Sequence, residues 1–191
     1  VFSLLELAKR NGVEFLSNCK LENASFADGA WTLQAHDGRR IRAKYAVNAA
    51  GLHADDVSRI FGAEEFRISA RKGEEYLLDR TSAAYPSKVV FPVPVKHSKG
   101  VLVIPTVDGT TMVGPTAEIV GDKEEHSTTA ENRSAVFRQA RRMVPAVSER
   151  DLITGFSGSR PVMEGNDFYI AFSKKVEKLI QAAGIQSPGL T

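Results

Sequence analysis

The sequence predicts a mixed α+β protein, with a largely antiparallel β-sheet domain that carries helices and a smaller part with parallel strands. Two observations support this prediction. Between residues 13 and 116, many segments alternate apolar and polar side chains between Asp-Gly or Lys-Gly pairs, which is typical of antiparallel hairpins. In contrast, residues 45–51 and 178–184 contain apolar runs that end in Ala-Ala-Gly, as expected of parallel strands buried on both faces.

The chain is expected to begin with a helix over residues 1–12. Apolar residues recur there at helical spacing, and Lys9 and Arg10 fall in the last turn before an Asn-Gly pair. A meander of antiparallel strands follows, with hairpin turns at Asp28-Gly29 and Asp37-Gly38. This meander leads into the first of the two apolar strands.

The middle of the chain is predicted to form a short helix and then a second, largely antiparallel sheet. The helix follows Gly51 and is closed by Gly62. Gly73 is interpreted as a turn between the first two strands of the sheet. The predicted strands are residues 66–69, 74–79, 89–94, 100–106 and 110–116.

The last part of the chain predicts one helix between strands. Residues 120–134 are polar and indicate a surface loop, in which Thr129 can cap a helix over residues 130–144. Pro145 ends this helix, because it cannot continue the backbone hydrogen-bond pattern. The remaining predicted strands are residues 151–159, 167–173 and 178–184.

Composition and charge indicate which partners, cellular compartment and metal sites can be expected for this protein. With 25 basic and 23 acidic side chains the formal charge is 25 − 23 = +2, which argues against a nucleic-acid partner and gives no indication of membrane association. The single cysteine, Cys19, excludes an internal disulfide and indicates a reducing compartment. We therefore expect a cytoplasmic protein, with attachment to the periphery of the inner membrane left open. No histidine has acidic neighbours at metal-ligand spacing, so no metal site is expected.

Both Ala-Ala-Gly turns are candidate ligand contacts. Small residues at the end of a strand allow the backbone to approach a ligand closely. In open α/β sheets, ligands bind at the carboxyl ends of the parallel strands. The residues concerned are Ala49, Ala50 and Gly51 in the first turn, and Gly184 in the second.

Several stretches together resemble the family of FAD-dependent oxidoreductases that contains D-amino-acid oxidase, glycine oxidase, glycerol-3-phosphate dehydrogenase and L-2-hydroxyglutarate dehydrogenase. The matching stretches occur in order within residues 13–191. They are "VNAAGLHADDVSRI", "RKGEEYLLD", "GVLVIPTVDGTTMVGPTAE", "GFSGSRPV", "DFYI" and "GIQSPGLT". The third of them points to the glycerol-3-phosphate and 2-hydroxyglutarate branch.

The resemblance implies a fold, a cofactor and a reaction. Residues 1–62 and 176–191 would be remnants of a Rossmann-like FAD-binding domain, and residues 63–175 the antiparallel substrate domain. The family's G-x-G-x-x-G fingerprint is absent from this sequence. We therefore expect an internal fragment that also lacks the final helix and binds FAD poorly alone. The full protein would oxidise a secondary alcohol that bears an anionic group, by hydride transfer to the flavin. Electrons would then pass to a quinone or another carrier.

The resemblance also assigns site residues. Arg160 would grip the anionic group of the substrate, because a guanidinium fork suits a carboxylate or phosphate. Arg71, Lys72 and Tyr76 are further substrate candidates, and no general base can be identified. His53, after the first turn, is expected near the FAD phosphates and not as a catalyst. The flavin contacts would be Ala49, Ala50, Gly51, Gly184, Ile185, Gln186, Ser187 and Gly189.

The nature of the substrate stays open at this point. If Arg71 and Arg160 face each other across the flavin, they could hold the two ends of a diacid such as L-2-hydroxyglutarate. If they converge on one point, the dianionic phosphate of glycerol 3-phosphate is favoured. The "RKGEEYLLD" stretch is somewhat closer to the hydroxyglutarate branch and slightly favours a hydroxy acid. The alternatives are an amino-acid or amine oxidase of the same family and a non-catalytic β-rich binding module.

Overall fold

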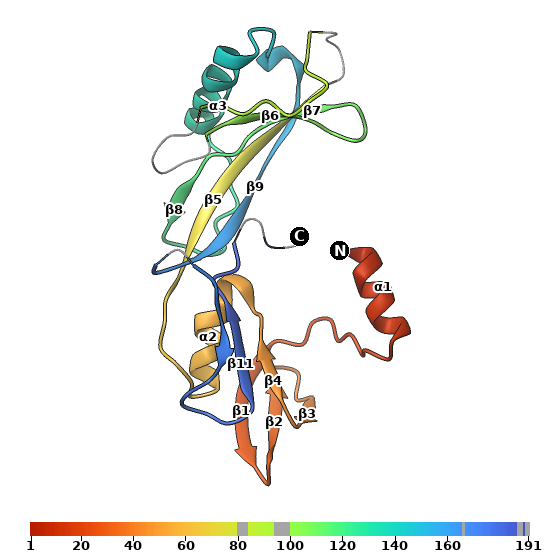
Figure 1. Ribbon diagram of the computed structural model, residues 1–191, viewed down its shortest axis with the longest axis vertical. Helices are drawn as coiled ribbons and strands as arrows, with labels where there is room; N and C mark the ends of the chain where they lie inside the picture. Colours follow the sequence, from red (N-terminus) through yellow and green to blue (C-terminus); the bar gives the residue numbers. More distant parts are fainter. Residues whose placement is uncertain (80–83, 94–99, 166, 187–188, 190–191) are drawn as a thin grey trace. The chain divides into compact units, whose positions relative to one another are not determined.

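The structure is a computed structural model that describes residues 1–79, 84–93, 100–165, 167–186 and 189 (Figure 1). The chain forms two compact units, and each unit contains separate stretches of the sequence. The first unit comprises Val1–Asn48, Asp56–Glu65 and Ile170–Gln181, and the second comprises Ala49–Asp55, Phe66–Tyr169 and Ala182–Thr191. Two of the changes between units, after residues 65 and 169, fall near the sequence-based boundaries at 62/63 and 175/176.

The first unit begins as the sequence predicts. Helix α1 (Phe2–Arg10) is followed by an antiparallel sheet in the order β1-β2-β3. The bounds of these strands are Leu21–Ala27, Ala30–Ala35 and Arg40–Ala43. Gly29 and Gly38 have φ angles of 72° and 86°, so each Asp-Gly turn uses the left-handed backbone that glycine adopts without steric cost.

A second sheet in this unit contains the two apolar strands. Its order is β10-β11-β4, with bounds Tyr169–Phe172, Leu179–Ala183 and Ala46–Asn48. Strand β4 runs parallel to β11, with Asn48 opposite Gln181, which confirms the predicted parallel pairing. The expected burial on both faces is wrong for β4, because the side chain of Val47 is 61% exposed.

Polar side chains hold these parallel strands to the helix that follows them. The buried Gln181 amide accepts a hydrogen bond from Asn48 Nδ2 (2.8 Å) and donates one to Ser58 Oγ (2.7 Å). Ser58 belongs to α2 (Ala54–Ile60), which follows the short 3-10 helix Gly51–His53. The apolar core of the unit gathers around Trp31, whose ring lies 4.7 Å from that of Phe61.

The second unit is built on a long central strand. Strand β5 (Ile68–Leu78) pairs on one side with β7 (Thr111–Gly114) and β8 (Glu118–Val120). It pairs on the other side with β9 (Leu152–Met163), over its whole length. Strand β6 (Leu102–Pro105) completes the sheet beside β7, and all pairings are antiparallel. Figure 1 shows β5 and β9 as the two long neighbouring strands.

Three sequence-based boundaries in this sheet need correction. The two strands predicted around Gly73 are one strand, because Gly73 pairs with Gly158 in an unbroken ladder. Arg160 lies inside β9 and not after it. The predicted strand over residues 89–94 is, in its described part, only an isolated bridge from Val90 to Val103, and Pro92 has no N–H to extend the pairing.

Helix α3 (Ala130–Met143) covers one face of this sheet. Thr129 caps it by accepting a hydrogen bond from Asn132 N (3.1 Å), as the sequence predicts. Residues of the helix and of the strands form one apolar core, which includes Phe137 and Tyr76. Along β5 the burial alternates, so one set of side chains faces α3 and the other set faces away.

Candidate functional site

Two of the predicted substrate residues lie directly opposite each other on the face that points away from α3. The register of β5 and β9 places Arg71 opposite Arg160. Side chains of directly opposite residues leave the same face of a sheet, with Cβ atoms about 5 Å apart. Both arginines are half-buried. This register places the two cations as cross-strand neighbours on one face, and it argues against arginines that start from two distant parts of the sheet.

Two glycines form the floor beside the arginine pair. Gly73 and Gly158 are also opposite each other, one pair further along the same face. Nη2 of Arg160 lies 3.5 Å from the position that a Cβ atom of Gly73 would occupy. A Cβ atom on Gly158 would meet nothing within 4 Å. The open area of this face is therefore at Gly158, whereas the Cβ position of Gly73 lies against Pro115 and Thr116 as well as the Arg160 guanidinium.

Glu75 is the next charged residue on this face, and the sequence analysis missed it as a site residue. It lies two residues beyond Gly73 and opposite Phe156, whose side chain is 43% exposed. Burial raises the pKa of the Glu75 carboxyl, while the nearby charge of Arg160 opposes that change. Strand alternation alone places Arg71, Gly73 and Glu75 on one face, so the signal was present in the sequence.

The three charged side chains of this face lack close partners. In the described part of the chain, Arg71, Glu75 and Arg160 make no hydrogen bond or ion pair through their side chains, although Glu75 and Arg160 interact at longer range. Half-buried charges without partners are unusual in a purely structural role, because desolvation is then uncompensated. We call Arg71, Gly73, Glu75, Gly158 and Arg160 the arginine face, and it is the candidate substrate site.

Lys72 and Tyr76, also predicted to bind substrate, lie on the opposite face of β5. The Nζ atom of Lys72 donates to Ser127 O at 2.9 Å and lies 3.5 Å from Glu74 Oε1. The Tyr76 hydroxyl donates to Glu74 Oε2 at 2.7 Å, in the core under α3. The structure therefore does not bring these two residues together with Arg160. They support a buried carboxylate instead of facing a ligand.

This buried carboxylate fixes the start of α3. Glu74 accepts hydrogen bonds from Thr129 N (2.9 Å) and Asn132 Nδ2 (2.8 Å), both at the amino-terminal end of the helix. Burial alone would raise the pKa of Glu74, but these hydrogen bonds, the Tyr76 hydroxyl and the charge of Lys72 hold it below its ordinary value. A carboxylate also interacts favourably with the positive end of the helix dipole. The network orders the scaffold beneath the arginine face.

The small-residue turns continue directly from the paired strands β4 and β11. Ala49 and Ala50 are exposed, and Gly51 has a φ angle of 58°. Gly184 is buried with a φ angle of 68°, and a Cβ atom there would lie 3.1 Å from both Asp167 O and Met163 Cβ. Glycine adopts this backbone angle without strain, and a side chain at position 184 would also crowd Asp167 and Met163.

The other predicted flavin contacts follow this turn. Ile185 and Gln186 are half-buried and Gly189 is exposed, whereas Ser187 lies outside the described residues. His53 is exposed, and its Nε2 atom lies 2.8 Å from Glu124 Oε1. The two turns thus offer exposed backbone at the carboxyl ends of neighbouring parallel strands, where ligands of open α/β sheets bind.

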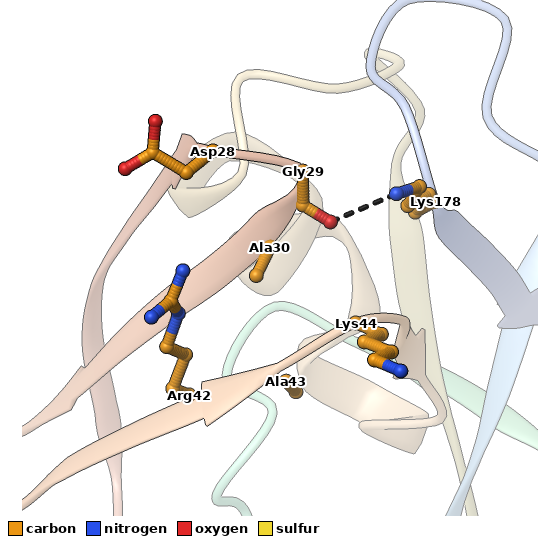
Figure 2. Close-up of a pocket in the computed structure, with 7 residues that line it drawn as sticks. All are labelled: Asp28, Gly29, Ala30, Arg42, Ala43, Lys44 and Lys178. Atoms are coloured by element: carbon orange, nitrogen blue, oxygen red, sulfur yellow. Dashed lines mark hydrogen bonds between the residues drawn. The ribbon is translucent and has the colours of Figure 1, made fainter.

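A separate basic pocket lies in the first unit. It has a volume of about 630 Å³, and Lys178 closes one side by donating to Gly29 O at 2.8 Å (Figure 2). Lys178 and Lys44 lie just before strands β11 and β4, so the pocket lies at the amino ends of these strands. Ligands of such sheets bind at the opposite ends. The lining residues are Asp28, Gly29, Ala30, Arg42, Ala43, Lys44 and Lys178.

The described residues contain no group of three or more His, Cys, Asp or Glu side chains that could hold a metal ion. No helix among them has both the length and the apolar character needed to cross a membrane.

Comparison with known proteins identifies the family. Residues 1–191 match a family described as FAD dependent oxidoreductase. This chain belongs to that family. The family membership confirms the resemblance found in the sequence, and the mixed α+β fold with antiparallel sheets is confirmed as well.

This FAD dependent oxidoreductase chain is similar to several proteins that are named as oxidases or dehydrogenases of hydroxy compounds. A glycerol 3-phosphate dehydrogenase of Caloramator mitchellensis is 38% identical over 190 residues, which cover 99% of this chain and 39% of that protein. A mitochondrial L-2-hydroxyglutarate dehydrogenase of Arabidopsis thaliana is 27% identical over 165 residues, covering 76% of this chain and 34% of that protein. The solved structure of L-alpha-glycerophosphate oxidase from Mycoplasma pneumoniae, reduced and with FAD bound, has a TM-score of 0.90 at 29% identity. It is covered over 50% of its length, and 97% of this chain is covered, so the chain spans half or less of each of these proteins.

Proposed function

We propose that this chain is part of an FAD-dependent enzyme that oxidises glycerol 3-phosphate. The arginine pair carries the proposal, since Arg71 and Arg160 are cross-strand neighbours without close partners among the described residues. A phosphate group carries a charge near −2 and accepts several hydrogen bonds, which suits two convergent guanidinium groups. The names of the dehydrogenase and oxidase relatives agree with this substrate.

The second candidate substrate is an L-2-hydroxy acid with two carboxylates, in line with the name of the plant relative. A diacid needs a second cationic grip away from the first. On the arginine face, the charged residue next to the arginine pair is Glu75, whose negative charge would repel a second carboxylate. The proposal therefore reverses the slight preference for a hydroxy acid that was based on the "RKGEEYLLD" stretch alone.

We propose that the FAD contacts come from the two small-residue turns. Ala49, Ala50 and Gly51 would approach the cofactor after β4, and Gly184, Ile185, Gln186, Ser187 and Gly189 after β11. The place of these turns supports this assignment, because they follow the carboxyl ends of two neighbouring parallel strands. When bound, FAD supplies the acceptor for the hydride that leaves the alcohol carbon. The residues of this chain bind and orient the substrate, and the electron acceptor, a quinone or another carrier, stays a prediction.

The experiment that tests this function uses the full-length protein. Its visible absorbance spectrum should show a bound flavin, and anaerobic addition of glycerol 3-phosphate should bleach it. L-2-hydroxyglutarate and glycine serve as comparison substrates, the latter for the amine oxidase alternative. A colourless protein, or bleaching by glycine and not by glycerol 3-phosphate, would overturn the proposal.

A further inference from the structure

We propose that Glu75 recognises the carbon chain of the substrate, by accepting a hydrogen bond from its terminal hydroxyl while Arg71 and Arg160 hold the phosphate. This inference rests on the proposed function and assigns a role to a residue that neither the sequence analysis nor the comparisons single out. It makes Glu75 the residue that selects a polyol phosphate over other phosphorylated alcohols.

The position of Glu75 supports this role. Glu75 lies two residues beyond Gly73, which corresponds to about 7 Å along a strand. The guanidinium of Arg160 lies next to Gly73, with Nη2 at 3.5 Å from the Cβ position of that glycine. Pro115 and Thr116 cover Gly73, whereas Gly158 on the paired strand faces open space. A ligand with its phosphate on the arginine pair therefore extends over Gly158 toward Glu75 and its cross-strand partner Phe156. The three-carbon chain of glycerol 3-phosphate places its terminal hydroxyl at the end away from the phosphate, which is the Glu75 end.

The neighbours of Glu75 hold its side chain on this face. A Cβ atom on Gly114 would lie 2.9 Å from Glu75 Cγ, so only a glycine at position 114 leaves room for the Glu75 side chain. On the other side, Phe156 is the cross-strand partner of Glu75. Glu75 thus has Gly114 on one side and Phe156 as its neighbour on the other strand, and its Cγ atom lies close to the space that a side chain at position 114 would need.

The Glu75 carboxylate can accept a hydrogen bond from a hydroxyl group of the ligand, and it repels an anionic group of the ligand. Glu75 accepts no hydrogen bond from any residue that the structure describes, and it is half-buried. A half-buried acceptor without a hydrogen bond is stabilised when the ligand supplies a donor, because the missing hydrogen bond is then formed. A hydroxyl is such a donor, whereas a carboxylate or a second phosphate is repelled.

The test compares two substrates in the full-length holoenzyme. Glycerol 3-phosphate has the terminal hydroxyl, and 2-hydroxypropyl phosphate lacks it but keeps the reacting alcohol and the phosphate. For the unaltered enzyme we expect kcat/KM to fall by about 10- to 100-fold on removal of this hydroxyl, as for hydrogen bonds to charged groups. In Glu75→Ala and Glu75→Gln, the two substrates should differ by less than about threefold, because the acceptor charge is gone.

Controls separate the role of Glu75 from folding and from the proposed function. Glu131→Ala, at an exposed position of α3, should keep the ratio of the two substrates unchanged. Inorganic phosphate, as a competitive inhibitor, should bind Glu75→Ala at least as tightly as the unaltered enzyme, since the arginine pair is intact. An unaltered ratio in both Glu75 variants would overturn this inference alone. An enzyme that oxidises neither substrate would overturn the proposed function as well.

Discussion

Substituting Gly158→Leu fills the open area of the arginine face and tests whether that area is used. A Cβ atom at this position meets nothing within 4 Å, so the added side chain causes no clash with the described structure. Glycine inside a strand costs roughly 0.5–1 kcal/mol relative to alanine, so the variant should be at least as stable as the unaltered protein. For a chain of 191 residues this corresponds to a melting temperature that is unchanged or higher by about 2–4 °C.

The effect on function should be opposite to the effect on stability. The leucine side chain would occupy the space next to the Arg160 guanidinium and displace a bound phosphate. We expect KM for glycerol 3-phosphate to rise by at least about tenfold, which corresponds to ~1.4 kcal/mol. Steady-state kinetics and thermal denaturation of the full-length holoenzyme measure the two effects separately.

Two glycine variants serve as controls for Gly158→Leu. Gly121→Leu also extends into open space, but it lies in an exposed loop and should change neither property. Gly73→Ala places its methyl group 3.0 Å from Pro115 Cβ and Thr116 O, so it should lower the stability by about 1–3 kcal/mol through overpacking. If Gly158→Leu leaves KM unchanged while the flavin stays bound, the arginine face is not the substrate site.

Three further predictions concern single side chains. Arg160→Ala should lower kcat/KM for glycerol 3-phosphate by the equivalent of about 2–4 kcal/mol, and unchanged steady-state kinetics would contradict its role. Tyr76→Phe should lower the stability by about 1 kcal/mol through loss of the hydrogen bond to Glu74, with no change in KM; a raised KM would return Tyr76 to the substrate site. Glu64 has its pKa lowered to about 2 because hydrogen bonds from Lys174 N, its own backbone N–H, Gln181 and Ser173 outweigh the effect of burial. Since this folded-state pKa lies below the unfolded value, its contribution of up to about 3 kcal/mol is present above pH 5 and is lost as the pH falls toward 2. Urea unfolding of Glu64→Gln should therefore show a smaller loss of stability across this range than the unaltered protein, and equal pH profiles would refute the assignment.

Local patterns of the sequence were sufficient for most of the elements. The Asp-Gly turns, the Thr129 cap and the alternation along residues 74–78 depend on backbone angles and on neighbours a few residues away, so they can be derived without the fold. The same is true of the apolar strand before Gly51. The turn predicted at Gly73 was wrong. A glycine indicates a turn when only its neighbours in the sequence are considered, and only the pairing with β9 shows that the strand continues through Gly73.

The candidate site depended on contacts between residues far apart in the sequence. Arg160 and Arg71 were both expected to bind an anion, but only the register of β5 and β9 makes them direct neighbours, and the proposal of one phosphate group is built on this register. Lys72 and Tyr76 lie on the other face of β5 from Arg160, and nothing local in the sequence shows that α3 covers that face.

The sequence by itself determined the family, most of the elements and which residues carry charge, since these follow from short motifs and from the periodicity of 2 or 3.6 residues. The tertiary structure decided which charges share a surface and which are neutralised inside. That decision comes from strand register and from the packing of α3, which are set by the burial of apolar side chains over the whole unit. Glu75 shows the difference, because its place beside Arg160 follows from the pairing of two distant strands.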